Sequence, residues 1–197
     1  MFTGLIRYQG KFRGLRKNLT EILIEVPEEL ATQLVPGQSL AVDGICLTVS
    51  LKEKDRLSFN LSKETLELTN LKDYRPGKMV NLELPLRLDE LVGGHLVTGH
   101  VDGTGRVVEV KRRPPGKRLK IKLPSGLRRY LAEKGSVAVN GVSLTVASLG
   151  PDWFEVELIP ATLQATNLCD LRAGDRVNLE GDILGKYVYN FIAEKKF

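Results

Sequence analysis

The sequence predicts an all-β protein made of two tandem, similar, six-stranded antiparallel barrels with a helix at the C-terminus. One observation is a repeat: residues 39–49 return 97 positions later as residues 136–146, with seven of the eleven residues identical. A second is that both copies are centred on a tight-turn dipeptide, Asp43-Gly44 and Asn140-Gly141, which indicates a β-hairpin because both turn positions need positive φ. A third is the series of short strand-like runs and glycine turns with little helix, which is typical of small barrels.

The repeat covers almost the whole chain. The same offset of 97 pairs residues 65–71 with 162–168 and residues 77–83 with 174–180, and an offset of 95 pairs Thr3-Gly4 with Thr98-Gly99. A period this long indicates a tandem domain duplication rather than a solenoid. We therefore expect one barrel in residues 1–88, a second in residues 89–186 and a separate C-terminal helix in residues 187–197.

Each element has its own signal. We expect strands at 21–25, 57–61, 80–84, 105–110, 119–123, 153–158 and 177–180, in addition to the arms of the two hairpins. Helices are expected at 27–34, which has a proline in its first turn, at 125–133 with Ser125 as its cap, and after Ser62, which caps a third. The repeat is lost after residue 182, and we expect the tail from residue 183 to be a helix that packs on another subunit.

Composition narrows the class of protein. A net charge of +5, 42% apolar residues and 27% charged residues are ordinary for a soluble globular protein. No apolar run is long enough for a membrane helix, and the first residues lack a signal-peptide pattern, so no membrane association is expected. The two cysteines, Cys46 and Cys169, are not repeat mates, which favours a reducing compartment such as the cytoplasm.

A basic run at residues 111–122 has two interpretations. It is either a nucleic-acid arm or a solvated turn between two strands, as its Pro-Pro-Gly centre suggests. No aromatic residue interleaves the basic side chains to stack on a base, so we favour the turn and expect no nucleic-acid partner.

The two hairpins carry outward-facing polar side chains. In the arm after the first turn, Ile45, Leu47 and Val49 share one face, which must be the core, so Cys46 and Thr48 point away from the barrel interior. By the same alternation, Ser143 and Thr145 point outward in the second copy. Cys46 is the repeat mate of Ser143, and this difference suggests two similar pockets with different roles.

The two histidines lie in one glycine-rich segment. His95 and His100 are five residues apart, but no further ligands accompany them in a common zinc pattern, so no metal is expected. A buried histidine with a structural role is the simpler interpretation of His95. The repeat mate of His100 is Leu5, so the fold does not need the imidazole, and we expect His100 to act as an acid or base.

Other candidates each have a structural alternative. Ser143 could be a nucleophile or an ordinary strand serine, and no Gly-x-Ser-x-Gly elbow supports a hydrolase triad. Cys46 could be a reactive or a structural thiol. Lys134 replaces Gly37 and could be catalytic or merely solvated, and Asp182 could orient a hydroxyl or an imidazole, or cap the tail helix.

Taken together, these motifs resemble the alpha-type riboflavin synthase family. The resemblance covers residues 1–188 and rests on the Met-Phe-Thr-Gly start, the Gly-x-Cys/Ser-Leu-Thr-Val hairpins, the Gly-Gly-His-Leu-x-x-Gly-His segment and the Thr-Leu-x-x-Thr-Asn-Leu turns. It implies Greek-key barrels and a homotrimer joined through C-terminal helices. It also implies dismutation of two 6,7-dimethyl-8-ribityllumazine molecules without a metal or redox cofactor. Lumazine synthase is a further possible partner.

The resemblance places the working site between the N-terminal barrel of one subunit and the C-terminal barrel of a neighbour, with two substrate molecules per site. Our hypothesis is that His100 and Ser143 carry out proton transfer and activation, that Asp182 supports them, and that Cys46 and Lys134 assist at the facing ring. The first pocket would be lined by Phe2, Thr3, Gly4, Leu5, Ile6, Ser39, Cys46, Leu47, Thr48, Asn60, Leu61, Ser62, Lys63, Glu64 and Thr65. The second would be lined by Gly99, His100, Val101, Lys134, Ser143, Leu144, Thr145, Glu157, Leu158, Ile159, Pro160, Ala161 and Thr162.

A non-catalytic carrier of lumazine, similar to the lumazine proteins of luminous bacteria, is the main alternative. Such carriers lack many of the side chains that could take part in catalysis. This chain retains Cys46, His95, His100, Ser143 and Asp182, so we favour an enzyme over a carrier. Ala161 and Asn60 stand where acids are common in the family, so contacts to the ribityl chain are expected to differ.

Overall fold

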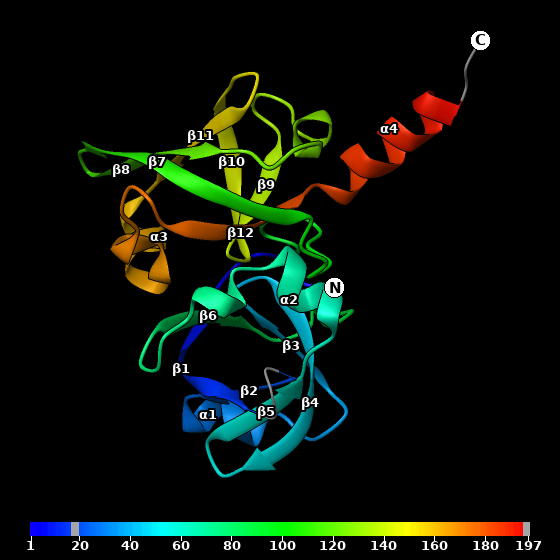
Figure 1. Ribbon diagram of the computed structural model, residues 1–197, viewed down its shortest axis with the longest axis vertical. Helices are drawn as coiled ribbons and strands as arrows, with labels where there is room; N and C mark the ends of the chain where they lie inside the picture. The colour runs from blue at the N-terminus through cyan, green and yellow to red at the C-terminus, as the bar shows by residue number, and fades with distance from the viewer. Residues whose placement is uncertain (17–19, 195–197) are drawn as a thin grey trace.

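The structure is a computed structural model that describes residues 1–16 and 20–194, and within them the chain forms two closed six-stranded barrels (Figure 1). The first barrel contains β1 (Tyr8–Arg16), β2 (Glu21–Glu25), β3 (Ser39–Val42), β4 (Ile45–Glu53), β5 (Arg56–Asn60) and β6 (Met79–Glu83). The second contains β7 (Gly103–Arg113), β8 (Gly116–Lys122), β9 (Ser136–Val139), β10 (Val142–Leu149), β11 (Trp153–Leu158) and β12 (Arg176–Gly181). The strand order is β1-β2-β5-β4-β3-β6 in one barrel and the equivalent β7-β8-β11-β10-β9-β12 in the other, so the duplicated sequence folds twice into one antiparallel topology.

Short helical segments connect the strands. They are α1 (Glu28–Thr32), α2 (Lys63–Leu68), α3 (Pro160–Ala165) and the 3₁₀ turns η1 (Leu71–Asp73), η2 (Leu127–Tyr130) and η3 (Asn167–Asp170). Ser62 caps α2 as expected, because its hydroxyl accepts a hydrogen bond from the backbone N–H of Thr65 at 3.0 Å. The predicted cap at Ser125 is wrong: the segment begins at Gly126 in a left-handed conformation and makes one 3₁₀ turn instead of an α-helix.

Strand alternation places the reactive hairpins as the sequence predicts. Ile45, Leu47 and Val49 are buried in the core of the first barrel, while Cys46 is half-buried and Thr48 is exposed. The β9–β10 hairpin repeats this pattern, with Ser143 half-buried and Thr145 exposed. The basic run forms the β7–β8 hairpin, which confirms its interpretation as a turn between two strands.

The barrels meet at an interface with approximate two-fold symmetry. Asn81 on β6 donates from its side-chain amide to the carbonyl oxygen of Asn140 at 3.0 Å, and its repeat mate Asn178 donates to the carbonyl oxygen of Asp43 at 3.0 Å. These asparagines are all but fully buried. The two hairpin turns also touch, since a Cβ on Gly44 would lie 2.6 Å from the backbone nitrogen of Gly141. Because buried polar groups need their partners, this network fixes how the barrels are oriented.

The symmetry of this interface is broken at one position. Asp43 accepts a short hydrogen bond from the hydroxyl of Tyr74, whereas the repeat mates of these residues are Asn140 and Leu171. Burial raises the pKa of the Asp43 carboxyl, and hydrogen bonds from Tyr74 and Asn81 oppose that rise. The first barrel therefore keeps an ionisable group where the second has an amide.

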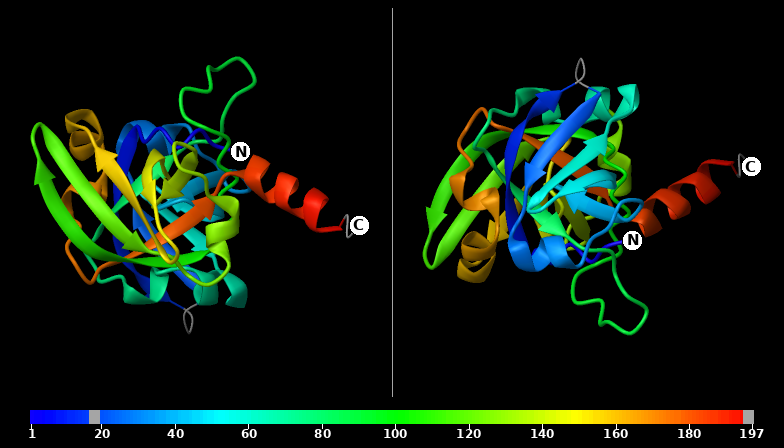
Figure 2. Two further views of the ribbon diagram at one scale, coloured as in Figure 1. Left: turned by 90° about the horizontal axis from the view of Figure 1, so that it is seen from above. Right: turned by 90° about the horizontal axis from the view of Figure 1, so that it is seen from below.

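The C-terminal helix α4 (Ile183–Glu194) projects from the second barrel in every view (Figures 1 and 2). It begins at Ile183, so the domain boundary expected at residue 187 falls inside it, and the expected extension over residues 195–197 lies outside the described residues. Lys186 pairs with Asp102 at 2.6 Å, and Tyr189 packs edge-on against Tyr130. Within the described residues, no helix is long and apolar enough to cross a membrane.

Candidate active site

Ser143 and His95 form a hydrogen-bonded pair at the interface of the barrels. The Oγ atom of Ser143 on β10 lies 2.7 Å from Nδ1 of His95, which comes from the segment between the barrels. The donor of this bond depends on which ring nitrogen carries the proton. When Nδ1 is unprotonated, it accepts the hydroxyl proton, which is the arrangement that activates a serine oxygen.

The environment of His95 favours the neutral imidazole. Burial lowers the pKa of His95, and the nearby charge of Asp182 acts in the opposite direction. The side chain is 8% exposed, and its Nε2 atom is buried without a hydrogen-bond partner among the described residues. The burial of His95 agrees with the sequence-based expectation. Its contact with Ser143 was not predicted from the sequence.

A cavity of about 350 Å³ opens beside Ser143. Its volume is at the small end of the range of small-molecule sites. Its lining consists of predicted second-pocket residues together with Ala147, which was not predicted: Lys134, Ser143, Leu144, Thr145, Ala147, Glu157, Ile159 and Thr162. Lys134 and Ser143 thus line one cavity, as their shared place in the second predicted pocket implies.

Lys134 has an unusual backbone. Its φ is +66°, and its repeat mate Gly37 has a φ of +92°. A left-handed conformation favours glycine because a side chain costs roughly 1–2 kcal/mol there. A lysine retained at such a position beside a cavity is therefore a candidate for function rather than for stability.

The N-terminal segment and its repeat mate cross between the barrels. The backbone N–H of Ser143 donates to the carbonyl oxygen of Gly4 at 2.8 Å, and that of Cys46 donates to the carbonyl oxygen of Gly99 at 2.9 Å. Any Cβ on Gly4 would lie 2.6 Å from Cβ of Ser143, so the close approach requires glycine. Gly4 was expected in the pocket of Cys46 and Gly99 in that of Ser143, and the structure places each beside the other hairpin.

The apolar residues that follow Gly4 and Gly99 in the chain also pack against the opposite barrel. Ile6 packs against the core of the second barrel, and Val101 packs against the core of the first. A bridge between Phe2 and Val97 joins the two crossing segments. Each outward-facing hairpin is thus completed by a segment that precedes the other barrel.

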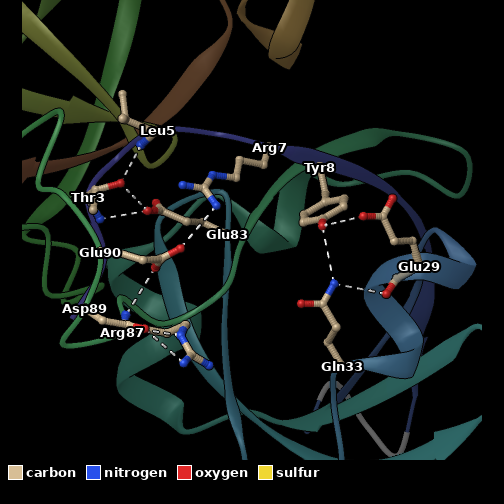
Figure 3. A network of polar contacts seen from close by, with 10 residues as sticks. All are labelled: Thr3, Leu5, Arg7, Tyr8, Glu29, Gln33, Glu83, Arg87, Asp89 and Glu90. Atoms are coloured by element: carbon tan, nitrogen blue, oxygen red, sulfur yellow. Dashed lines mark hydrogen bonds and ion pairs between the residues drawn. The ribbon is translucent and has the colours of Figure 1, made fainter.

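Two buried carboxylates hold the crossing segments. Glu83, at the end of β6, accepts hydrogen bonds from the backbone N–H and hydroxyl of Thr3, both at 2.7 Å (Figure 3). It also accepts one from the N–H of Gly4 at 3.0 Å. Glu180, at the end of β12, holds Thr98 and Gly99 in the same way. Burial raises the pKa of both carboxyl groups, while the hydrogen bonds they accept lower it. These glutamates were not predicted, although their identity in both copies was a usable signal.

The remaining predicted residues differ in accessibility. His100 is exposed, and Asp182 accepts a hydrogen bond from the N–H of Leu184 at 3.0 Å, which is the helix-capping alternative considered from the sequence. The exposed members of the predicted set are Leu5, Thr48, Asn60, Ser62, Lys63, Glu64, His100, Lys134, Thr145, Glu157, Ile159, Pro160 and Ala161. The half-buried ones are Ile6, Ser39, Cys46, Thr65, Val101, Ser143, Thr162 and Asp182.

Some predicted binding residues point into the protein interior. The buried ones are Phe2, Thr3, Gly4, Leu47, Leu61, Gly99, Leu144 and Leu158. Because the side chains of Leu47, Leu61 and Leu158 belong to the barrel cores, these three residues could offer a ligand mainly their backbone groups. Among the residues that the structure describes, no three His, Cys, Asp or Glu side chains gather in a way that could hold a metal ion.

The twin barrels with their polar, outward-facing hairpins define a protein of the lumazine-binding class. The family model described as "Lumazine binding domain" matches the chain twice, over residues 3–85 and 98–182. The fold is also similar to a crystal structure of LumP complexed with 6,7-dimethyl-8-(1'-D-ribityl) lumazine, with a TM-score of 0.82 and 24% identity over 91% of this chain and 98% of that chain.

Full-length relatives narrow the class. The chain is 42% identical to a riboflavin synthase of Chlamydia muridarum over 199 residues, which are 99% of this chain and 98% of the relative. It is 40% identical to a riboflavin synthase of Mycobacterium bovis over 193 residues, or 95% of this chain and 96% of the relative. The chain therefore belongs to the riboflavin synthase family, as the sequence motifs indicated.

Proposed function

We propose that this chain is a transferase that converts two molecules of 6,7-dimethyl-8-ribityllumazine into riboflavin and 5-amino-6-ribitylaminouracil. One lumazine donates a four-carbon unit to the other. Full-length similarity to riboflavin synthases is the observation that carries this proposal. The atoms of the two substrates equal those of the two products, so the reaction needs no external oxidant or reductant.

The chemistry requires two events at the paired rings. A base removes a proton from the C7 methyl group of one lumazine, and a nucleophile adds to the other. We assign activation of the Ser143 oxygen to His95, because these groups are 2.7 Å apart and burial favours the neutral imidazole. His100 is the second candidate for proton transfer, and its exposed position suits contact with a ring brought by a neighbouring subunit.

Residues of the two pockets would hold the rings. Lys134, Thr145 and Thr162 line the cavity beside Ser143 and offer charged and hydroxyl groups to one substrate. Cys46 and Thr48 occupy the equivalent positions on the first barrel and would face the other substrate. Holding both rings in register can supply roughly 7–11 kcal/mol of the acceleration, which makes positioning the main catalytic contribution.

We further propose a homotrimer in which each site combines the first barrel of one subunit with the second barrel of the next. Support comes from α4, whose side chains at 184, 187, 188, 191 and 192 are apolar and 58–68% exposed. This i, i+3, i+4, i+7, i+8 spacing forms one helix face, as expected of a helix that packs against other helices.

We also propose a cytoplasmic location, which is supported by the free thiols of Cys46 and Cys169.

We further propose association with lumazine synthase, the enzyme that would supply the lumazine substrate. Co-sedimentation of the two enzymes tests the association. Sedimentation of the enzyme in the lumazine synthase fraction is expected, and independent sedimentation at cellular concentrations would contradict it.

Turnover with no additive tests the proposed reaction. Purified protein is mixed with dimethylribityllumazine, and the products are separated by chromatography. Riboflavin and the aminouracil are expected in equal amounts. A stable fluorescent complex without turnover would instead support a carrier, the alternative that the fold similarity to LumP brings forward.

A further inference from the structure

Two hydrogen bonds tie the His95–Ser143 pair to the N-terminal segment. The carbonyl oxygen of Thr3 accepts from the backbone N–H of His95 at 3.2 Å, and the carbonyl oxygen of Gly4 accepts from the backbone N–H of Ser143 at 2.8 Å. The two partners of the pair are thus held by consecutive carbonyl groups. The Thr3–Gly4 peptide carries the carbonyl group bound to His95, and the next peptide carries the one bound to Ser143, so the position of this segment bears on both partners.

Glu83 fixes the position of that peptide. Its Oε1 atom accepts from both the N–H and the hydroxyl of Thr3, and its Oε2 atom accepts from the N–H of Gly4. All three bonds are 3.0 Å or shorter, and the carboxylate is 7% exposed. Hydrogen bonds from N–H donors to a buried carboxylate are among the stronger ones in proteins. Figure 3 shows the carboxylate of Glu83 directed at the backbone of Thr3.

The equivalent carboxylate in the second barrel, Glu180, supports other residues than the His95–Ser143 pair. Glu180 holds Thr98 and Gly99, and the carbonyl oxygen of Gly99 accepts from the N–H of Cys46 at 2.9 Å. The hydroxyl of Thr98 also accepts from the N–H of His100 at 3.2 Å. Glu83 therefore supports the His95–Ser143 pair, and Glu180 supports Cys46 and His100.

We propose that Glu83 is a positioning residue for the reaction: from the first barrel it aligns His95 with Ser143 through the two carbonyl groups of Thr3 and Gly4. Glu83 touches neither reacting group. This role rests on the proposed function, because it assumes that the His95–Ser143 pair takes part in turnover.

The test uses Glu83→Gln, which keeps the shape of the side chain but replaces one acceptor oxygen by an N–H₂ donor facing backbone N–H groups. The chain has only two histidines, so ¹⁵N-labelling of histidine in the full-length protein gives one spectrum for His95 and His100. We expect Glu83→Gln to change the Nδ1 signal of His95 while that of His100 stays in place. Glu180→Gln, the matched variant in the second copy, should leave the His95 signal unchanged.

Kinetics supply the second measurement. Displacement of the pair should lower kcat by about 10- to 100-fold, with a smaller change in KM, since misplacement of reacting groups by about 1 Å has effects of this size. In a Ser143→Ala background, Glu83→Gln should lower kcat by a much smaller factor, because the group that it positions is already gone. Equal factors in both backgrounds would overturn the proposal.

An unchanged His95 signal in folded Glu83→Gln protein would also overturn the proposal. If Glu83→Gln does not fold, Thr3→Val takes its place, since it removes one of the three donors and should shift the His95 signal in the same direction. A wild-type protein that produces no riboflavin would contradict the proposed function, whereas the His95 spectrum would still test the alignment itself.

Discussion

The Oγ atom of Ser143 lies 2.7 Å from Nδ1 of His95, and this contact joins the second barrel to the segment that links the barrels. The repeat mate of Ser143 is Cys46, which has no histidine partner among the hydrogen bonds of the described residues. The duplicated hairpins thus share a backbone conformation but differ in chemistry. This difference is the structural basis for assigning unlike roles to two otherwise similar pockets.

Loss of a proton-transfer group should slow turnover strongly. Ser143→Ala, His95→Gln and His100→Ala are each expected to lower kcat by about 100-fold or more, the scale of general acid–base assistance. Steady-state assays of riboflavin formation measure the effect. Ser148→Ala is the control, because Ser148 lies on the same strand and accepts from Arg118 outside the cavity. Wild-type rates in any of the first three variants would remove that residue from the mechanism.

Stability should depend on pH through His95. Because burial lowers its pKa, the folded protein takes up this proton at lower pH than the unfolded chain, whose value is about 6.5. The stabilisation is therefore complete above that value and is lost as pH falls from about 6.5 to the folded pKa, with a slope of at most about 1.4 kcal/mol per pH unit. Urea denaturation across this range should show a shallower dependence for His95→Gln. Parallel profiles would contradict the lowered pKa.

Lys134→Gly should separate stability from activity. The substitution installs the residue of the first copy at a left-handed position, so the free energy of unfolding should stay within about 1 kcal/mol of wild type. Turnover should fall, since the ammonium group leaves the cavity. Lys54→Gly is the matched control: Lys54 is an exposed lysine with a φ of +56° in the β4–β5 turn, and its loss should leave turnover unchanged. Equal activities of the two variants would refute a role for Lys134.

The oligomer should depend on the apolar face of α4. Deletion of residues 187–197 should convert the proposed trimer to monomers in analytical ultracentrifugation. Val188→Glu places a charge on that face and should have the same effect. Asn190→Glu introduces the same charge outside the apolar face and should leave the oligomer intact. An intact trimer after the deletion would show that subunits associate elsewhere.

Local patterns predicted much of the site, but not its long-range assembly. Hairpin signals and alternation correctly placed Cys46 and Ser143 outside the cores. β1 was not predicted, because glycines and basic residues interrupt its alternation, and Gly10 is buried there without a side chain. The crossing of the Gly4 and Gly99 segments was also missed, since alternation shows which face a residue occupies but not which barrel it touches.

Mixing two variants tests most directly whether barrels of different subunits form the site. Thr48→Trp should block the proposed first pocket and Thr145→Trp the cavity beside Ser143. Both residues are exposed repeat mates, so each variant alone should form an inactive oligomer. After the variants are mixed equally, unfolded and refolded together, about one quarter of the sites in a cyclic trimer should combine two unblocked barrels, and activity should return to about that level. No recovery from trimers shown to contain both variants would contradict a site shared between subunits.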